Sequence, residues 1–240
     1  MALALLGGGL VGGVVKAGDR AAGAPPLAAI PAGRFVMGGR EAEPPQERRE
    51  VEVPAFRMGL HEVTVREWVA WLNTPGAAGY PGSPQIVRRG DRFRPARGQA
   101  RRPAAWVSLA DAQAYCGWLS ERTRLRVRLP TEAEWERAAR GGLEGARYPW
   151  GWGAPEGRAC FAAKEAREVG SYPPNPYGLR DMAGNVFEWC APDPAGGAFA
   201  RGGSWAENDP RFLRVYNRVS FPAGYRDADV GFRIVVEQDE

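Results

Sequence analysis

The sequence predicts an α+β domain in which short strands and three helices hold a long irregular segment. Three observations predict it: apolar strand-like runs near both ends of the chain, three helix-start motifs, and a stretch over 141–229 made mostly of Gly, Pro, Trp, Asn and Asp. So long a stretch without periodicity is compatible with a compact domain only if side-chain hydrogen bonds, aromatic rings or a cation hold its loops. We therefore expect a loop-rich domain.

Strands are predicted where apolar residues alternate or cluster between turn residues. A loosely alternating run covers 30–37 and has a Pro-Ala-Gly turn at its start, and short strands follow over 51–53 and 56–60. The sequence VGFRIVV over 230–236 predicts a strong strand close to the end of the chain.

The three helices share one start signal, a hydroxyl residue followed three positions later by a carboxylate. The hydroxyl can accept from the third amide of the helix, while the carboxylate accepts from the amide of the hydroxyl residue itself, which is the capping-box pattern. The pairs are Thr64 and Glu67, Ser108 and Asp111, and Thr131 and Glu134, and they predict helices over about 65–73, 109–122 and 132–140.

Composition excludes several classes of protein. The 240 residues carry 32 Lys+Arg against 28 Asp+Glu, and 44% are hydrophobic, so the chain is not expected to be disordered. One His makes metal catalysis by several His implausible, and three Cys are too few for a disulfide scaffold. No apolar run reaches the length of a transmembrane helix.

The first residues, 1–27, are predicted to form a flexible apolar and Gly-rich segment, and 28–240 the folded domain. Residues 1–15 have the length of a signal-peptide core, but no basic region precedes them. A flexible tail or the remnant of a longer upstream segment fits equally well. The compartment, cytoplasmic or exported, is left open.

An arginine-rich segment over 85–102 contains seven Arg and one acid, Asp91. It could bind phosphates, or it could form a solvated hairpin around 89–91. We favour the hairpin, because no row of aromatic residues accompanies the charges. Nucleic acid is therefore an unlikely partner.

Taken in order, the motifs along the chain resemble the formylglycine-generating-enzyme (sulfatase-modifying factor) family over about 28–236. The motifs are IPAGRFVMG from Ile30, HEVT from His61, AYCGWL from Ala114, RLPTEAEWE from Arg128, PWG from Pro149, NPYGLRDMAGNVFEW from Asn175, RGGSW from Arg201 and GFR from Gly231. The resemblance implies a C-type-lectin-like α+β fold with a small antiparallel sheet, two or three helices and extensive irregular loops.

The resemblance also implies two reactive cysteines between the GGSW and GFR motifs, yet residues 206–230 contain none. A cysteine-oxidising enzyme is therefore not expected, and no copper, iron or nucleotide is expected as cofactor. A structural role is favoured for each of Cys116, Cys160 and Cys190.

The segment 206–229 instead resembles the variable region of the proteins diversified by diversity-generating retroelements, in which an error-prone reverse transcriptase substitutes at template adenines. The resemblance implies a surface that binds diverse protein ligands. Its expected positions are Ala206, Glu207, Asn208, Phe212, Leu213, Tyr216, Asn217, Val219, Ser220, Phe221, Gly224, Tyr225, Asp227 and Ala228, with Trp205, Arg214, Arg218 and Arg226 as the scaffold beneath. The other hypotheses are a formylglycine-type oxidoreductase and a family member that has lost catalysis.

A calcium ion is the second implication of the resemblance. It places the carboxylates of Asp181 and Glu188 and the carbonyls of Gly184 and Val186 on the ion, and such all-oxygen ligation suits calcium. Without the metal, Asn185 and Glu188 are expected to hydrogen-bond loop amides instead. Both interpretations stay open.

Overall fold

A computed structural model describes residues 25–39, 48–77 and 79–238. The expected flexible segment 1–27 lies outside the described residues except for its last three, and strand β1 already begins at Leu27. Pro26 is tied to the domain, since its carbonyl accepts a hydrogen bond from the amide of Leu60.

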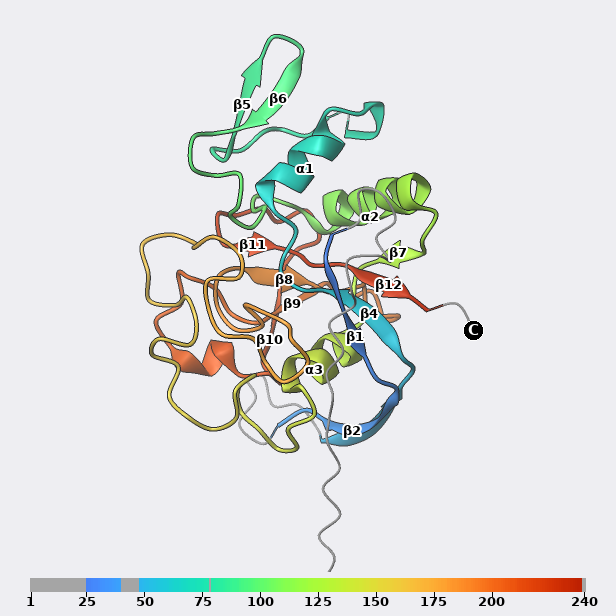
Figure 1. Ribbon diagram of the computed structural model, residues 1–240, viewed down its shortest axis with the longest axis vertical. Helices are drawn as coiled ribbons and strands as arrows, with labels where there is room; N and C mark the ends of the chain where they lie inside the picture. The colour runs from blue at the N-terminus through green and yellow to red at the C-terminus, as the bar shows by residue number, and fades with distance from the viewer. Residues whose placement is uncertain (1–24, 40–47, 78, 239–240) are drawn as a thin grey trace, which may run out of the picture.

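The described chain contains two four-stranded sheets, two short hairpins and three α-helices (Figure 1). The first sheet has the order β1-β4-β12-β7 and is antiparallel throughout. The second has the order β10-β9-β8-β11, with β11 parallel to β8. The strands are β1 (Leu27–Ile30), β2 (Gly33–Met37), β3 (Arg49–Val53), β4 (Phe56–Gly59), β5 (Ile86–Arg89), β6 (Arg92–Pro95), β7 (Val127–Arg128), β8 (Phe187–Trp189), β9 (Phe199–Arg201), β10 (Arg218–Ser220), β11 (Val230–Gly231) and β12 (Val235–Glu237).

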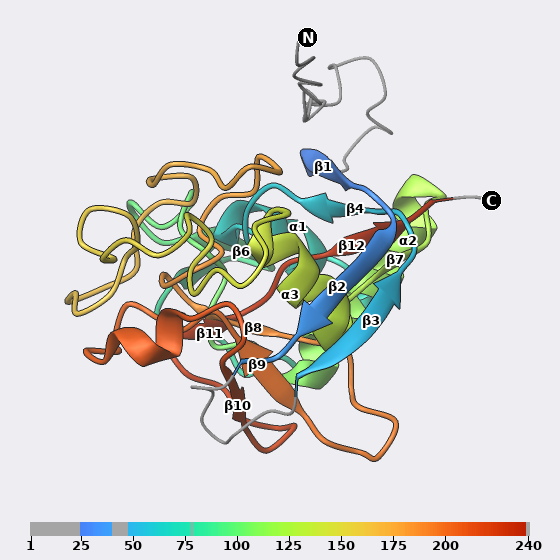
Figure 2. The same cartoon turned by 90° about the horizontal axis from the view of Figure 1, so that it is seen from below.

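The helices agree with the capping-box prediction. They are α1 (Val65–Leu72), α2 (Leu109–Thr123) and α3 (Glu132–Arg140), and each begins with the predicted pair in reciprocal hydrogen bonds. The two short 3-10 helices are η1 (Pro75–Ala77) and η2 (Pro210–Leu213). In both views α3 lies beside the β2–β3 hairpin (Figures 1 and 2).

Two of the predicted strands are interrupted. The run 30–37 divides between β1 and β2 at the Pro31-Ala32 turn. The run 230–236 divides between β11 in one sheet and β12 in the other. At the break lies Arg233, whose buried guanidinium binds Glu188 of β8 in the second sheet. It also donates to Gly59 O of β4 in the first sheet and to Arg180 O.

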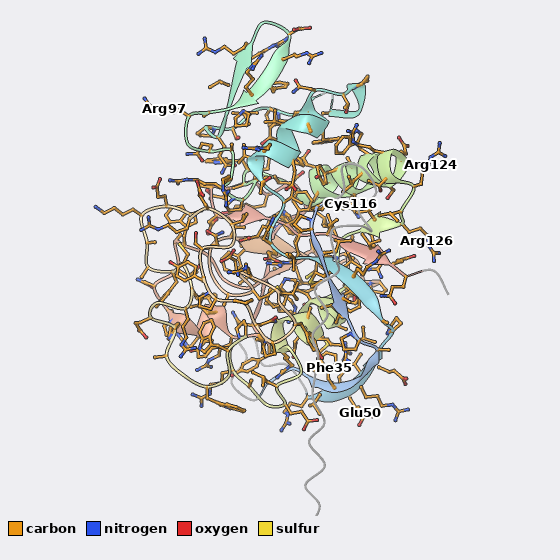
Figure 3. The ribbon with its side chains drawn as sticks, viewed as in Figure 1. Phe35, Glu50, Arg97, Cys116, Arg124 and Arg126 are labelled. Carbon is orange, nitrogen blue, oxygen red and sulfur yellow. The ribbon has the colours of Figure 1, made fainter. Side chains whose placement is uncertain are left out.

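Aromatic residues fill the core between α1, α2 and the end of the chain. The ring of Trp68 lies 4.4 Å from Trp71, 5.7 Å from Tyr115 and 5.8 Å from Phe232. Cys116 lies on the inner side of α2 in the same cluster (Figure 3). Three of the nine Trp, namely Trp68, Trp71 and Trp189, are thus buried in the core that joins the loops to the helices. None of the helices in the described part of the chain has the length and apolar character needed to cross a bilayer.

Candidate functional site

The segment 206–229 is closed at its two ends by side-chain hydrogen bonds. Ser204 Oγ donates to Asp229 Oδ2 at 2.8 Å, and Trp205 Nε1 donates to Ala228 O at 3.2 Å. The chain enters the segment through Gly203, where φ is +75° and an added Cβ would lie 3.0 Å from Phe212 O. A side chain is therefore excluded at this entry. Figure 1 shows the segment in orange and red between β9 and β11.

Between these ends the segment forms a turn of helix and an edge strand. Asp209 caps η2 by accepting from the Arg211 amide at 2.9 Å. Strand β10 then pairs with β9 at the edge of the second sheet. The backbone of the segment is thus partly held by regular hydrogen bonds.

Most of the expected ligand-binding positions reach the surface. Ala206, Asn208, Ser220 and Gly224 are exposed, and Glu207, Phe212, Val219, Phe221, Tyr225, Asp227 and Ala228 are half-buried. These side chains come from the edge strand β10, the short helix η2 and the connecting turns of one continuous segment.

Three expected positions are buried, which corrects the prediction that they are displayed. Leu213 is 0% exposed, because it ends η2 and packs with Tyr148 and Ala183. Tyr216 and Asn217 are 5% and 4% exposed, and the Tyr216 ring belongs to the core cluster around α3. These three side chains hold the segment to the domain.

The expected scaffold role has direct support at two arginines. Arg218 donates to Glu132 Oε2 at 2.7 Å and lies 4.1 Å above the Phe199 ring. Arg226 donates to Asp111 Oδ2 at 2.8 Å. The sequence predicts Asp111 only as part of a helix cap and gives no role to Glu132. Both acids lie in the first turn of a helix, and this position could have indicated their role, because acids there attract cations as well as amides.

Arg214 and Trp205, the other two expected scaffold residues, are half-buried. Arg214 O accepts from the Asn217 amide at 2.9 Å, so it supports the turn that leads into β10. Trp205 is packed against the small cluster of Ala105, Ala166 and Val186.

Aromatic side chains form a row along the segment. The rings of Phe221 and Tyr225 are stacked, with centroids 4.7 Å apart and planes inclined by 5°. Phe221 also contacts the buried Phe187 and Trp189 edge-on. Tyr225 donates its hydroxyl to Asp227 Oδ2 at 2.9 Å, which raises the pKa of Tyr225 to about 12. The inner side of this row thus packs on Phe187 and Trp189, while Phe221 and Tyr225 remain partly exposed to solvent.

The two carboxylates expected to bind calcium, Glu188 and Asp181, accept hydrogen bonds from the protein. Glu188 Oε2 accepts from Trp135 Nε1 and from Arg233 Nε, each at 2.6 Å, and its Oε1 accepts from Arg233 Nη2 at 2.6 Å. Asp181 Oδ2 accepts from the Gly170 amide. No group of three or more acidic, His or Cys side chains in the described ranges is arranged to hold a metal ion.

With Arg233 and Trp135 bound to it, the Glu188 carboxylate is not free to bind a calcium ion at the carbonyls of Gly184 and Val186. Arg233 supplies the positive charge that Glu188 needs. Asn185 Oδ1 accepts from the Arg167 amide at 2.9 Å, as expected for the loop without metal. Glu188 differs from that expectation, because it binds two side chains rather than loop amides.

Glu62 is a buried acid that the sequence analysis missed. Its Oε1 accepts from Asn185 Nδ2 at 2.8 Å, while its Oε2 has no hydrogen-bond partner among the described residues. Burial raises the pKa of Glu62 well above its ordinary value, and the nearby charge of Asp181 raises it further. The sequence feature that could have indicated it is the HEVT motif, in which Glu62 lies two residues before the helix cap Thr64.

The three cysteines are buried and free. Burial raises the pKa of Cys116 to about 12 and raises those of Cys160 and Cys190. The thiolate, which is the reactive form, is thereby disfavoured at each position. This agrees with a structural role for all three.

These sheets, helices and loops define a C-type-lectin-like α+β domain. A family model of the sulfatase-modifying factor enzyme 1-like domain matches residues 15–238, and the chain belongs to that family.

Curated relatives include enzymes and a protein named as inactive. The chain is 32% identical over 219 residues to a formylglycine-generating enzyme of Thermomonospora curvata, covering 69% of this chain and 70% of the relative. It is 34% identical over 270 residues to the inactive C-alpha-formylglycine-generating enzyme 2 of Mus musculus, covering 87% and 85%. It is also 35% identical to the serine/threonine-protein kinase pkn1 of Chlamydia caviae, covering 67% of this chain but only 26% of that relative's length.

Two solved structures are similar over nearly the whole domain. PvdO from Pseudomonas aeruginosa has a TM-score of 0.73 at 29% identity, covering 90% of this chain and 96% of the other. Treponema denticola variable protein 1 has a TM-score of 0.73 at 27% identity, covering 88% and 95%. The predicted fold and family resemblance are thus confirmed.

Proposed function

We propose that this chain is a non-catalytic binding protein whose 206–229 surface recognises a protein ligand and is varied by a diversity-generating retroelement. The observation that carries the proposal is the combination of an anchored backbone and displayed side chains in one segment. The ends meet through Ser204 and Asp229, while exposed positions such as Asn208 and Ser220 lie between them. The similarity to a solved variable protein supports it.

The anchoring explains how side chains here can change without loss of the fold. Arg218 and Arg226 are tied to first-turn acids of α3 and α2, and Leu213 is fully buried. Substitutions at exposed positions leave these contacts intact. The half-buried Phe212, Phe221 and Tyr225 offer large contact area at low entropic cost, as aromatic residues do in antibody loops.

The competing function is a formylglycine-type oxidoreductase or its inactive relative. Two observations favour binding over oxidation: residues 206–230 contain no Cys, and the chain's three Cys are buried with raised pKa values. Incubation of a Cys-containing peptide with the protein and copper, followed by mass spectrometry, tests the choice. We expect no aldehyde product, whereas the Thermomonospora curvata enzyme serves as the active control. Turnover by this chain would contradict the proposal.

A pair of display libraries tests the binding surface. One library randomises the four exposed positions Ala206, Asn208, Ser220 and Gly224, and the matched library randomises four exposed residues elsewhere, namely Glu156, Arg158, Lys164 and Arg167. Each is selected against the same panel of unrelated proteins. We expect specific binders from the first library at melting temperatures close to the parent. Equal yields from both libraries would show that 206–229 has no special capacity.

A further inference from the structure

The β5–β6 hairpin stands out from the body of the domain and is rich in arginine. Figure 1 shows it projecting beyond α1, at the end of the molecule opposite β2. Gly90 and Asp91 form its turn, and Gly90 has a φ of +64°. The hairpin expected around 89–91 is confirmed, and its two strands are β5 and β6.

The strand register gathers three arginines on one side. Residues directly opposite each other share a face, and faces alternate along each strand. Arg89 pairs with Arg92 and Val87 pairs with Arg94, so these four side chains form the outer hairpin face. All four are exposed. Like charges directly opposite each other are destabilising, so this arrangement opposes folding of the hairpin.

The base of the other side of the hairpin is covered by the domain, whereas Arg88 near the turn is exposed. Ile86 and Phe93 pack on the core cluster, and Arg88 lies over the Phe93 ring. Asn73, at the end of α1, accepts from the Phe93 amide at 2.8 Å and donates to its carbonyl at 3.0 Å. The outer hairpin face is therefore held in one orientation toward solvent.

The arginines of the outer hairpin face are not neutralised by the chain. Within the described ranges, Arg89, Arg92 and Arg94 form no ion pair, whereas Arg101 and Arg102 further along pair with Glu168 and Glu165. Arg97, also exposed, lies at the base of the hairpin with its side chain directed outward (Figure 3). The face thus presents a concentrated positive charge with a single acid, Asp91, at the turn.

We propose that the outer hairpin face binds the anionic phosphate headgroups of a phospholipid membrane surface. Guanidinium groups bind phosphate in a bidentate manner, and clustered basic residues are attracted to anionic leaflets. Val87, 39% exposed among the arginines, suits the boundary between headgroups and acyl chains. The surface is separate from 206–229, so the inference does not depend on the ligand proposal.

The geometry favours a membrane over a nucleic acid duplex. A ribbon that enters a groove faces walls on more than one side, but α1 and the core cover the inner side of this hairpin. A single open face matches a flat surface. Arginines at a free edge also discourage strand pairing, but that role does not require three of them on one face.

Vesicle sedimentation with the full chain tests the inference. The hairpin variant Arg89→Gln/Arg92→Gln/Arg94→Gln is compared with the control variant Arg122→Gln/Arg158→Gln/Arg167→Gln, which removes equal charge from exposed positions elsewhere. At about 0.1 M salt we expect the parent to bind mixed phosphatidylglycerol and phosphatidylcholine vesicles and not pure phosphatidylcholine. The hairpin variant should lose roughly a hundred-fold in partition coefficient, at about five-fold per arginine, while the control variant loses little.

Several outcomes would overturn the inference. Equal losses for the two variants would assign binding to net charge, and equal binding to neutral vesicles would remove the role of anionic headgroups. Binding of a fluorescent DNA duplex without vesicle binding would assign the face to nucleic acid. Melting curves check folding, and the hairpin variant should melt no lower than the parent because the Arg89–Arg92 repulsion is removed.

Discussion

Arg233 Nε lies 2.6 Å from Glu188 Oε2, and the two side chains are 0% and 1% exposed. Glu188 belongs to β8 in one sheet, whereas Arg233 lies between β11 and β12 and so links both sheets. The same carboxylate accepts from Trp135 on α3. This pair therefore joins three parts of the domain at the position where the family resemblance implies a metal.

Breaking this pair should be strongly destabilising. Arg233→Met leaves Glu188 buried and unpaired, and such losses cost about 3–5 kcal/mol. Urea denaturation measures the cost. The double variant Arg233→Met/Glu188→Gln should lose less than the sum of the single variants, because no uncompensated charge stays buried. Additive losses would show that the two groups do not depend on each other.

Glu62 should make stability depend on pH. Its pKa is raised in the folded state by burial, so the contribution to stability is full below the unfolded pKa and falls as pH rises toward the folded one. Glu62→Gln removes the ionisation and can still accept from Asn185. Denaturation should be measured as a function of pH. Above about pH 4.5 the free energy of unfolding of the variant should rise relative to that of the parent, by no more than about 1.4 kcal/mol per pH unit. Parallel pH profiles would contradict this.

Removal of calcium should leave the fold unchanged. Glu188 is bound by Arg233 and Trp135, so we expect the fold not to depend on a cation there. Thermal melting in chelator and in excess calcium should give the same midpoint. If calcium raised the melting temperature of the parent by several degrees but not that of Asp181→Asn, the result would support the calcium ligands that the resemblance implies.

Substitutions in 206–229 should separate by burial. Leu213→Ala removes a fully buried side chain and should cost about 2–5 kcal/mol. Asn208→Ala and Ser220→Ala act on exposed side chains and should stay within about 0.5 kcal/mol. Chemical denaturation of the three variants measures this. Equal costs would show that the segment is uniformly packed and cannot tolerate variation.

The helices were predictable because their signals are local. Each capping box spans four residues, and α3 has the predicted bounds while α1 and α2 differ by one residue. The break after Gly231 was not predictable in this way. It depends on Arg233 meeting Glu188, 45 residues earlier in the chain, and periodicity in one strand carries no information about that partner.

In the candidate site, too, local motifs were predictable and contacts between distant residues were not. The Gly-Gly-Ser-Trp entry and the position of the segment follow from sequence motifs, but the burial of Tyr216 depends on packing against the core around α3. Glu132 illustrates the remaining difficulty, since an acid at the start of a helix is common and only its meeting with Arg218 makes it part of the scaffold.

Deep sequencing of codons 201–235 in a growing population, with the flanking DNA, tests the central claim most directly. The account predicts amino-acid changes concentrated at the exposed and half-buried positions of 206–229, at sites where a nearby DNA copy has adenine. The codons of the buried Leu213, Tyr216 and Val230 should vary less. Uniformly low variation across 201–235, with no second copy of the segment, would contradict it.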